Sequence, residues 1–268
     1  MSKNPQIKIK NHDEIKIMAE GGLMLSNVNK GLKKVIKPGV SAWDIEVLAN
    51  KLIKAEGGEP SFKKVEGYSW ATCINLNDGI VHGIPKKEMM FKDGDIVSVD
   101  CGVYYRGFHT DSSFSVAIGT NKGVNKFLEV GKQALKNAIN EAKVGNRIYD
   151  ISNAMSQTLK ASGLNPVRAL VGHGVGRELH EEPQIPCFVS GKREYSPIIE
   201  DGYVLAIEAM YTEGSGDLVL ESDGWTISTS DGKISGLFEE TVAITKNGPL
   251  ILTNEDWAKL FGTKITET

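Results

Sequence analysis

Residues 93–111 read DGDIVSVDCGVYYRGFHTD and predict two strands joined by a tight turn. The first strand is rich in isoleucine and valine, and the second continues to Ile118 through alternating apolar residues. Gly107 supplies the turn residue between them.

Asp100 and Asp111 fall on one face of this hairpin with either two-residue turn. A turn centred on Tyr105 and Arg106 places the aspartates directly opposite each other. A turn centred on Arg106 and Gly107 makes them diagonal neighbours, because side chains alternate with period two. A bulged three-residue loop would disturb this parity. Like charges side by side destabilise a sheet unless a cation lies between them, so the hairpin predicts a bound cation.

The composition is that of a globular protein. A chain of 268 residues forms one large domain or two small ones, and 40% hydrophobic with 24% charged residues is ordinary. The net charge of −3 gives no reason to expect nucleic acid as a partner. We expect no signal peptide and no membrane span. Three cysteines without CxxC spacing indicate a reducing cytoplasm.

Basic residues cluster at positions 30–37 and 63–64. They form either a solvated helix face or a docking patch for an anionic partner.

Hydrophobic periodicity predicts the other elements. We expect helices over residues 12–35, from the N-cap Ser41 to about 55, over about 121–142 and over about 149–161. Strands are predicted at 72–76, 79–82 and 239–245, and a short helix at 255–257.

The second half of the chain repeats the first. Residues 37–45 align with 143–151 at an offset of 106, and residues 93–100 align with 201–208 at an offset of 108. Between them, the segment from His82 to Pro85 echoes that from His180 to Pro183. Three echoes in the same order indicate a duplication, so we expect two similar α+β halves, about 12–120 and 121–245, in one catalytic domain spanning 1–268. Glu208 then corresponds to Asp100, and the halves bring it to the two aspartates.

Four carboxylates and one imidazole make up the predicted site: Asp100, Asp111, Glu208, Glu239 and His173. A lone buried histidine is more often a core residue, but glycines flank His173 and allow close approach of a ligand. So much negative charge is costly to bury uncompensated. Oxygen ligands with one nitrogen suit divalent first-row metals, and bridging carboxylates suit two ions about 3.5–4 Å apart that lower the pKa of a bridging water.

His82 and His180 are then placed to hydrogen-bond a substrate carbonyl and the developing oxyanion. His109 shares parity with Asp111 and is at most a supporting residue. The alternative is an acidic surface pocket with unrelated histidines.

These segments resemble the type I methionine aminopeptidases over nearly the whole chain. The resemblance is carried by residues 77–85, 99–102, 109–111, 172–183, 206–210 and 237–241. It implies the pita-bread fold, with two pseudo-symmetric halves around a central antiparallel sheet. It also implies removal of the initiator methionine from nascent proteins when the second residue is small.

The resemblance also implies the roles of the site residues. One metal takes Asp111, His173, Glu208 and Glu239, and the other takes Asp100 with bridging Asp111 and Glu239. Glu208 acts as general base, His180 steadies the tetrahedral intermediate, and His82 bonds the substrate near its scissile amide. Tyr68, Cys73 and Trp225 match the methionine pocket, although each taken alone is explained as well by core packing.

Two positions depart from the family pattern. Glu240 stands where histidine is common and is expected to face away from the metals, and Leu179 stands where an aromatic residue is common. The metal remains open among manganese, iron, cobalt, nickel and zinc. We expect a monomer, and Lys33, Lys34, Lys63 and Lys64 are candidates for transient contact with the ribosome.

Two alternative functions are possible on the same fold. X-Pro peptidases carry a further N-terminal domain, and a non-catalytic binding module would have lost a metal ligand.

Overall fold

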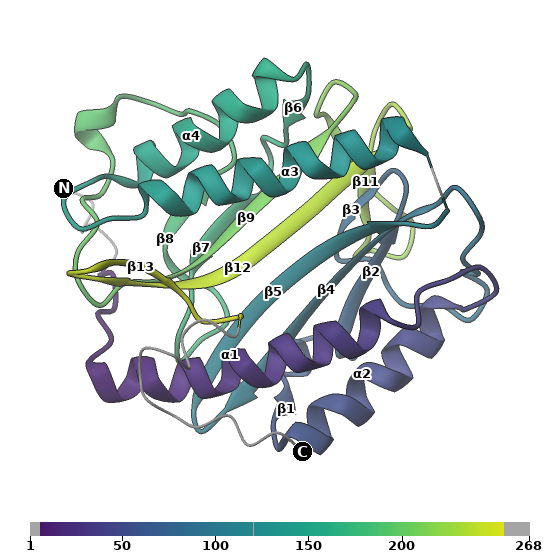
Figure 1. Cartoon of the computed structure of the whole chain (residues 1–268), viewed down its shortest axis with the longest axis horizontal. Coiled ribbons are helices and arrows are strands. Elements are labelled where there is room, and N and C mark those ends of the chain that lie inside the picture. Colours follow the sequence, from purple (N-terminus) through teal and green to yellow (C-terminus); the bar gives the residue numbers. More distant parts are fainter. Residues whose placement is uncertain (1–5, 120, 255–268) are drawn as a thin grey trace.

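A ten-stranded antiparallel sheet forms the centre of the molecule in the computed structural model, which describes residues 6–119 and 121–254 (Figure 1). Its main path runs β1-β4-β5-β12-β9-β7-β8, with β2 added to β4, β6 to β9 and β13 to β12. A separate three-stranded sheet has the order β10-β11-β3. The strands are β1 (Glu59–Pro60), β2 (Thr72–Leu76), β3 (Gly79–Val81), β4 (Ile96–Tyr105), β5 (Phe108–Ala117), β6 (Asn165–Pro166), β7 (Val171–Gly174), β8 (Glu181–Pro186), β9 (Val204–Thr212), β10 (Leu218–Leu220), β11 (Ile227–Thr229), β12 (Ser235–Thr245) and β13 (Gly248–Ile251).

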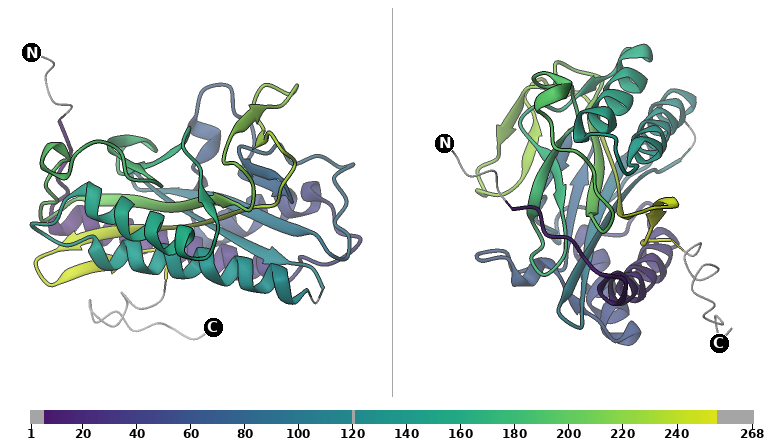
Figure 2. Two further views of the ribbon diagram at one scale, coloured as in Figure 1. Left: turned by 90° about the horizontal axis from the view of Figure 1, so that it is seen from above. Right: turned by 90° about the vertical axis from the view of Figure 1, so that its left-hand side faces the viewer.

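The helices cover one face of the large sheet, and the small sheet stands on the other side (Figure 2). They are α1 (His12–Lys33), α2 (Ala42–Glu56), α3 (Lys122–Glu141) and α4 (Ile148–Ala161), with short 3-10 turns at Phe62–Lys64 and Arg193–Tyr195. Helix α1 packs on β4 and β5, whereas α3 packs on β9 and β12. No helix in the described part of the chain is long and apolar enough to cross a membrane.

The predicted helices are confirmed, with small shifts at their ends. Ser41 is the N-cap of α2, as predicted, and its hydroxyl accepts a hydrogen bond from Asp44 N at 3.1 Å. Gly57 ends this helix in the left-handed conformation, with φ 90°. Helix α1 stops at Lys33, two residues before the predicted end. The predicted helix at 255–257 lies outside the described residues.

The strands predicted at 72–76 and 79–82 are confirmed as β2 and β3. The last long strand begins at Ser235, earlier than predicted, and the second hairpin strand ends at Ala117 rather than Ile118.

The turn of the central hairpin decides which residues face each other. Tyr105 pairs with Phe108, so the central pair is Arg106 and Gly107, with φ 48° and 92°. A two-residue hairpin turn of this type needs positive φ at both central positions, which glycine adopts freely and the bulky Tyr105 does not. The directly opposed arrangement of the aspartates is therefore wrong.

Asp100 pairs with Ser113 and Asp111 pairs with Gly102 in this register. The two aspartates are diagonal neighbours on one face, which is the arrangement that the turn at Arg106 and Gly107 predicts.

The two halves of the chain contribute alike to the sheet. Strand β1, which follows α2, pairs with β4, and β6, which follows α4, pairs with β9. Strands β5 and β12 meet between them. Two separate apolar clusters lie beneath the helices, one against α1 and α2 and the other against α3 and α4. This arrangement confirms two pseudo-symmetric halves around an antiparallel sheet and places Asp100 and Glu208 on corresponding strands.

Candidate metal centre and active site

Because side chains alternate along a strand, the acidic residues of the central strands lie on the face of the sheet away from the helices. On β4, Val99 and Cys101 pack into the helix-side cluster, so Asp100 between them faces the other way. On β9, Ile207 and Ala209 do the same on either side of Glu208. Burial of the apolar set on one face therefore fixes where the carboxylates point.

A row of polar side chains crosses four neighbouring strands on that face. Asp100 on β4 lies opposite Ser113 on β5, and Ser113 lies opposite Glu239 on β12. Glu239 in turn lies opposite Glu208 on β9. Three carboxylates from both halves of the chain thus share one line of the sheet.

Asp111 and His173 flank this row. Asp111 is two residues from Ser113 on β5, so it shares the same face. His173 on β7 pairs with Ala206, which is two residues from Glu208 on β9. The five predicted ligands therefore come from five neighbouring strands.

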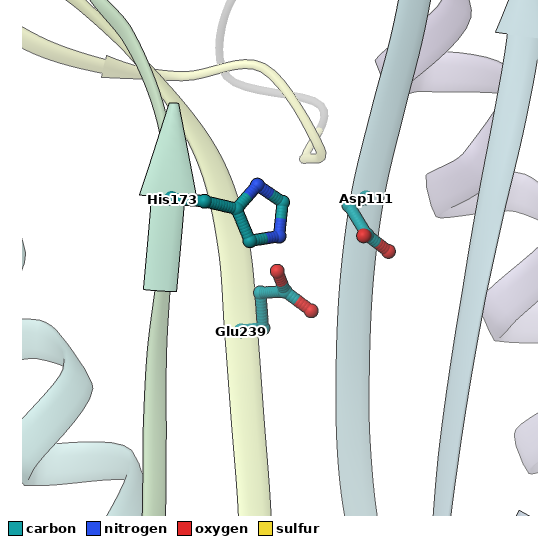
Figure 3. Close-up of side chains that lie close together, drawn as sticks. All are labelled: Asp111, His173 and Glu239. Atoms are coloured by element: carbon teal, nitrogen blue, oxygen red, sulfur yellow. The ribbon is translucent and has the colours of Figure 1, made fainter. Parts of the chain in front are cut away.

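Three of these residues form a compact group of potential metal ligands. Asp111, His173 and Glu239 each offer one ligand atom within 4.8 Å of the others, and all three are buried (Figure 3). Asp100 and Glu208 line the same pocket. They are not part of this three-residue group, which was identified among the described residues.

One pocket of about 290 Å³ is lined by all the predicted metal ligands, both predicted substrate-facing histidines and the three residues that match the methionine pocket. These ten residues are His82, Asp100, Asp111, His173, His180, Glu208, Glu239, Tyr68, Cys73 and Trp225. An acidic surface pocket with unrelated histidines does not describe this arrangement.

The buried carboxylates are electrostatically unsatisfied by the protein alone. Burial raises the pKa of Asp111, Glu208 and Glu239 well above the usual values, and neighbouring carboxylates raise it further. Burial also raises the pKa of Asp100, to about 7. Oδ1 of Asp100 and Oδ1 of Asp111 have no hydrogen-bond partner in the described part of the chain. Orphaned buried carboxylate oxygens fit divalent cations, which neutralise the charge and use the free lone pairs.

The histidines of the pocket are held in the neutral form. Burial lowers the pKa of His173 to about 3, and partial desolvation in the pocket lowers the pKa of the half-buried His82 and of the more exposed His180. His173 Nδ1 lies 2.9 Å from Gly174 O, so in the neutral ring Nδ1 donates to that carbonyl and Nε2 carries the lone pair. This hydrogen bond leaves His173 as a metal ligand through Nε2.

One wall of the pocket is apolar and aromatic. The rings of Tyr68 and Trp225 meet edge to face with centroids 5.1 Å apart, and Tyr68 Oη donates to Thr72 O at 2.9 Å. Cys73 and Leu179 pack in the same cluster. The pocket therefore combines carboxylates with a wall suited to an unbranched apolar side chain.

Two further residues lie outside this pocket. His109 Nδ1 is 2.6 Å from Ser61 Oγ, and His109 lines a neighbouring cavity that shares His180 with the pocket. Glu240 accepts a hydrogen bond from Thr253 and lines a cavity on the helix side beside Lys33. The prediction that Glu240 faces away from the ligands is confirmed.

Several lining residues were missed by the sequence analysis. Met210 follows Glu208 by two positions on β9, so strand alternation alone could have identified it. Phe62 and Leu170 enter the pocket from a 3-10 turn and a loop. No periodic signal marks residues in such segments.

Comparison with known proteins identifies the family of the chain. The sequence pattern of "Metallopeptidase family M24" matches residues 16–246. The chain belongs to this family. A methionine aminopeptidase of Clostridium perfringens is 40% identical over 92% of the chain and 98% of its own length. Methionine aminopeptidase 1 of Bacillus subtilis is 41% identical over 90% of the chain and 96% of its own length.

Solved structures of other proteins have the same fold. A methionine aminopeptidase from Thermotoga maritima matches with a TM-score of 0.90 and 41% identity, covering 93% of this chain and all of the other. A prolidase from Pyrococcus furiosus matches with a TM-score of 0.74 at 23% identity, covering 92% of this chain and 65% of the other. The pita-bread prediction is confirmed. Membership of a metallopeptidase family implies divalent metal ions, and the donors of the pocket fit them.

Proposed function

We propose that the protein is a metal-dependent aminopeptidase that removes the initiator methionine when the second residue is small. The observation that carries this proposal is a single pocket lined both by the buried group of Asp111, His173 and Glu239 and by an aromatic wall. The chain also matches proteins named methionine aminopeptidase over nearly their full length, which supports the proposal.

Two divalent ions are proposed to sit among the five ligands. Asp111, His173, Glu208 and Glu239 would hold one ion, and Asp100 with the bridging Asp111 and Glu239 would hold the other. The orphaned oxygens of Asp100 and Asp111 support this assignment. When bound, the ions supply Lewis-acid polarisation and lower the pKa of water so that it attacks at neutral pH.

Glu208 is proposed as the general base that takes the proton from the attacking water. Its carboxylate lies in the same row as Glu239, and burial raises its pKa well above the usual value. Cations held beside Glu208 would favour its ionised form, which is the form that accepts a proton.

His180 and His82 are proposed to act on the peptide rather than on the ions. Both rings line the pocket and are neutral near pH 7, because partial desolvation lowers their pKa. A neutral ring donates one N–H, which His180 would direct at the developing oxyanion and His82 at the substrate near its scissile amide. His82 has φ 57°, an uncommon conformation for a residue with a side chain.

The aromatic wall is proposed to select methionine. Tyr68, Cys73 and Trp225 line it, with Leu179 and Phe62 packed beside them. Thioether contacts with aromatic edges and sulfur are favourable, and an unbranched side chain fits a narrow apolar pocket.

The proposed setting is the cytoplasm, with nascent proteins as substrates. All three cysteines are buried and free, which fits a reducing compartment. The chain is proposed to act as a monomer with one catalytic domain, 1–268, built from repeated halves of about 12–120 and 121–245. Contact with the ribosome would be transient.

The proposal is tested by release of methionine from Met-Ala-Ser by protein loaded with Mn²⁺ or Co²⁺, with and without EDTA. We expect release that EDTA abolishes and that either ion restores. Ala-Pro dipeptides are the control for the prolidase-like alternative. Cleavage of Ala-Pro with Met-Ala-Ser untouched, or release that EDTA does not affect, would contradict the proposal.

A further inference from the structure

The segment that precedes α1 is fastened to the loop that carries His180. Lys10 is only 5% exposed, and its Nζ donates to Glu181 Oε2 at 2.7 Å. Lys10 N also donates to Gly202 O at 2.8 Å, which fixes the backbone on which this side chain stands.

Both oxygens of the Glu181 carboxylate are occupied. Oε2 receives Lys10, whereas Oε1 receives Glu178 N at 3.2 Å and Lys8 Nζ at 3.4 Å. The Glu181 side chain is 2% exposed, so water does not replace a lost partner easily. The carboxylate thus ties the backbone of its own loop to Lys10.

The loop from Gly176 to Glu181 fits closely around Lys10. A Cβ atom at Gly176 would lie 2.4 Å from Lys10 Cε, so the lysine stem runs directly over that glycine. His109 N donates to Gly176 O at 2.7 Å, and Arg177 Nη2 donates to Glu14 Oε1 at 2.9 Å. The loop is therefore held between the N-terminal segment, α1 and β5.

His180 stands next to Glu181 at the end of this loop. Its ring lies edge to face with His173, with centroids 4.5 Å apart, and lines the pocket. The position of this ring therefore depends on the segment that Lys10 and Glu181 hold.

We propose that Lys10 is a positioning residue, which acts through Glu181 to hold His180 against the substrate. Lys10 is not among the residues that line the pocket, so its effect is indirect. This inference rests on the role of His180 in the proposed function. A displacement of about 1 Å in such a group lowers turnover on the order of 10²-fold.

Lys10→Met is the primary test, measured on Met-Ala-Ser with Mn²⁺-loaded protein. We expect kcat to fall about 10–100-fold, while the Mn²⁺ content per chain stays at the wild-type value. Lys10→Arg keeps a long cation and should recover most of the lost kcat. Lys16→Met, an exposed lysine on the following helix, is the matched control and should behave as wild type.

A double-mutant cycle separates positioning from a general loss of structure. In a His180→Ala background, Lys10→Met should lower kcat little further, because the residue through which it acts is already gone. A further fall of similar size, a loss of bound Mn²⁺, or wild-type kcat in Lys10→Met alone would overturn the inference. If Lys10→Met does not fold, Glu181→Gln replaces it in the same cycle with the same expected non-additivity. Wild-type protein that releases no methionine would instead overturn the proposed function.

Discussion

Glu208 and Glu239 face each other across β9 and β12, and burial raises the pKa of both carboxyl groups. Two adjacent acids that are shielded from water repel each other unless cations or protons lie between them. Cations bound among these acids would favour the ionised form of Glu208, which can then accept a proton.

Replacing Glu208 by Gln should reduce kcat about 10²–10⁴-fold, because the amide has no basic oxygen to accept the proton. Binding of Met-Ala-Ser should persist, because the aromatic wall is untouched, and calorimetry with a non-hydrolysed analogue would measure it. Glu240→Gln is the control, since that side chain faces the helix side. Near-normal turnover of Glu208→Gln would exclude Glu208 as the base.

Individual site residues were predictable where strand alternation or the resemblance marked them. The hairpin pattern predicts that Asp100 and Asp111 share one face with either two-residue turn. The same alternation of side chains along β9 could have predicted Met210. Phe62 was not, because it reaches the pocket from a 3-10 turn whose direction depends on distant packing. Lys10 gave no signal either, since its partner Glu181 is far away in the chain.

Helix α3 packs against strand β9 through the buried ring of Tyr211. Tyr211 is fully buried, and its Oη donates to Phe127 O at 3.0 Å. A Cβ atom at Gly131 on α3 would lie 2.2 Å from Tyr211 Oη and 2.4 Å from the ring. The glycine thus allows the helix to approach the sheet behind Glu208.

Gly131→Ala should therefore destabilise the protein. Overpacking of this kind typically lowers the free energy of unfolding by ~1–3 kcal/mol, whereas alanine raises it by at most ~1 kcal/mol over glycine in a helix. The net effect should therefore be destabilising. Gly31→Ala on α1 is the matched control, since a Cβ there meets only the flexible end of Leu52 within 3 Å. Urea unfolding measures both variants. Equal or greater stability of Gly131→Ala would show that Tyr211 moves aside without cost.

The elements themselves were largely predictable, because helix periodicity and caps are local. The exact hairpin turn was not, since the choice between two turns depended on which residue tolerates positive φ. The order of the ten strands was also beyond local reasoning, because strand pairing joins residues far apart, such as Ser113 and Glu239.

Two pseudo-symmetric halves make up the described part of the chain. Each half supplies two helices and a long strand that bears a carboxylate, and the two halves meet at β5 and β12. Asp100 comes from one half and Glu208 from the other, while His173 and His180 come from the second half alone. The repeat in the sequence predicted this meeting, but the closeness of Asp111, His173 and Glu239 appears only in the folded chain.

The central claim is that this junction between the halves holds catalytic metal ions. Anomalous diffraction from crystals grown with Mn²⁺ tests it directly, using protein whose methionine release has been measured. We predict two anomalous peaks inside the pocket, both in contact with Asp111 and Glu239 and one with His173. Active protein whose crystals show no anomalous peak in that pocket would contradict the account.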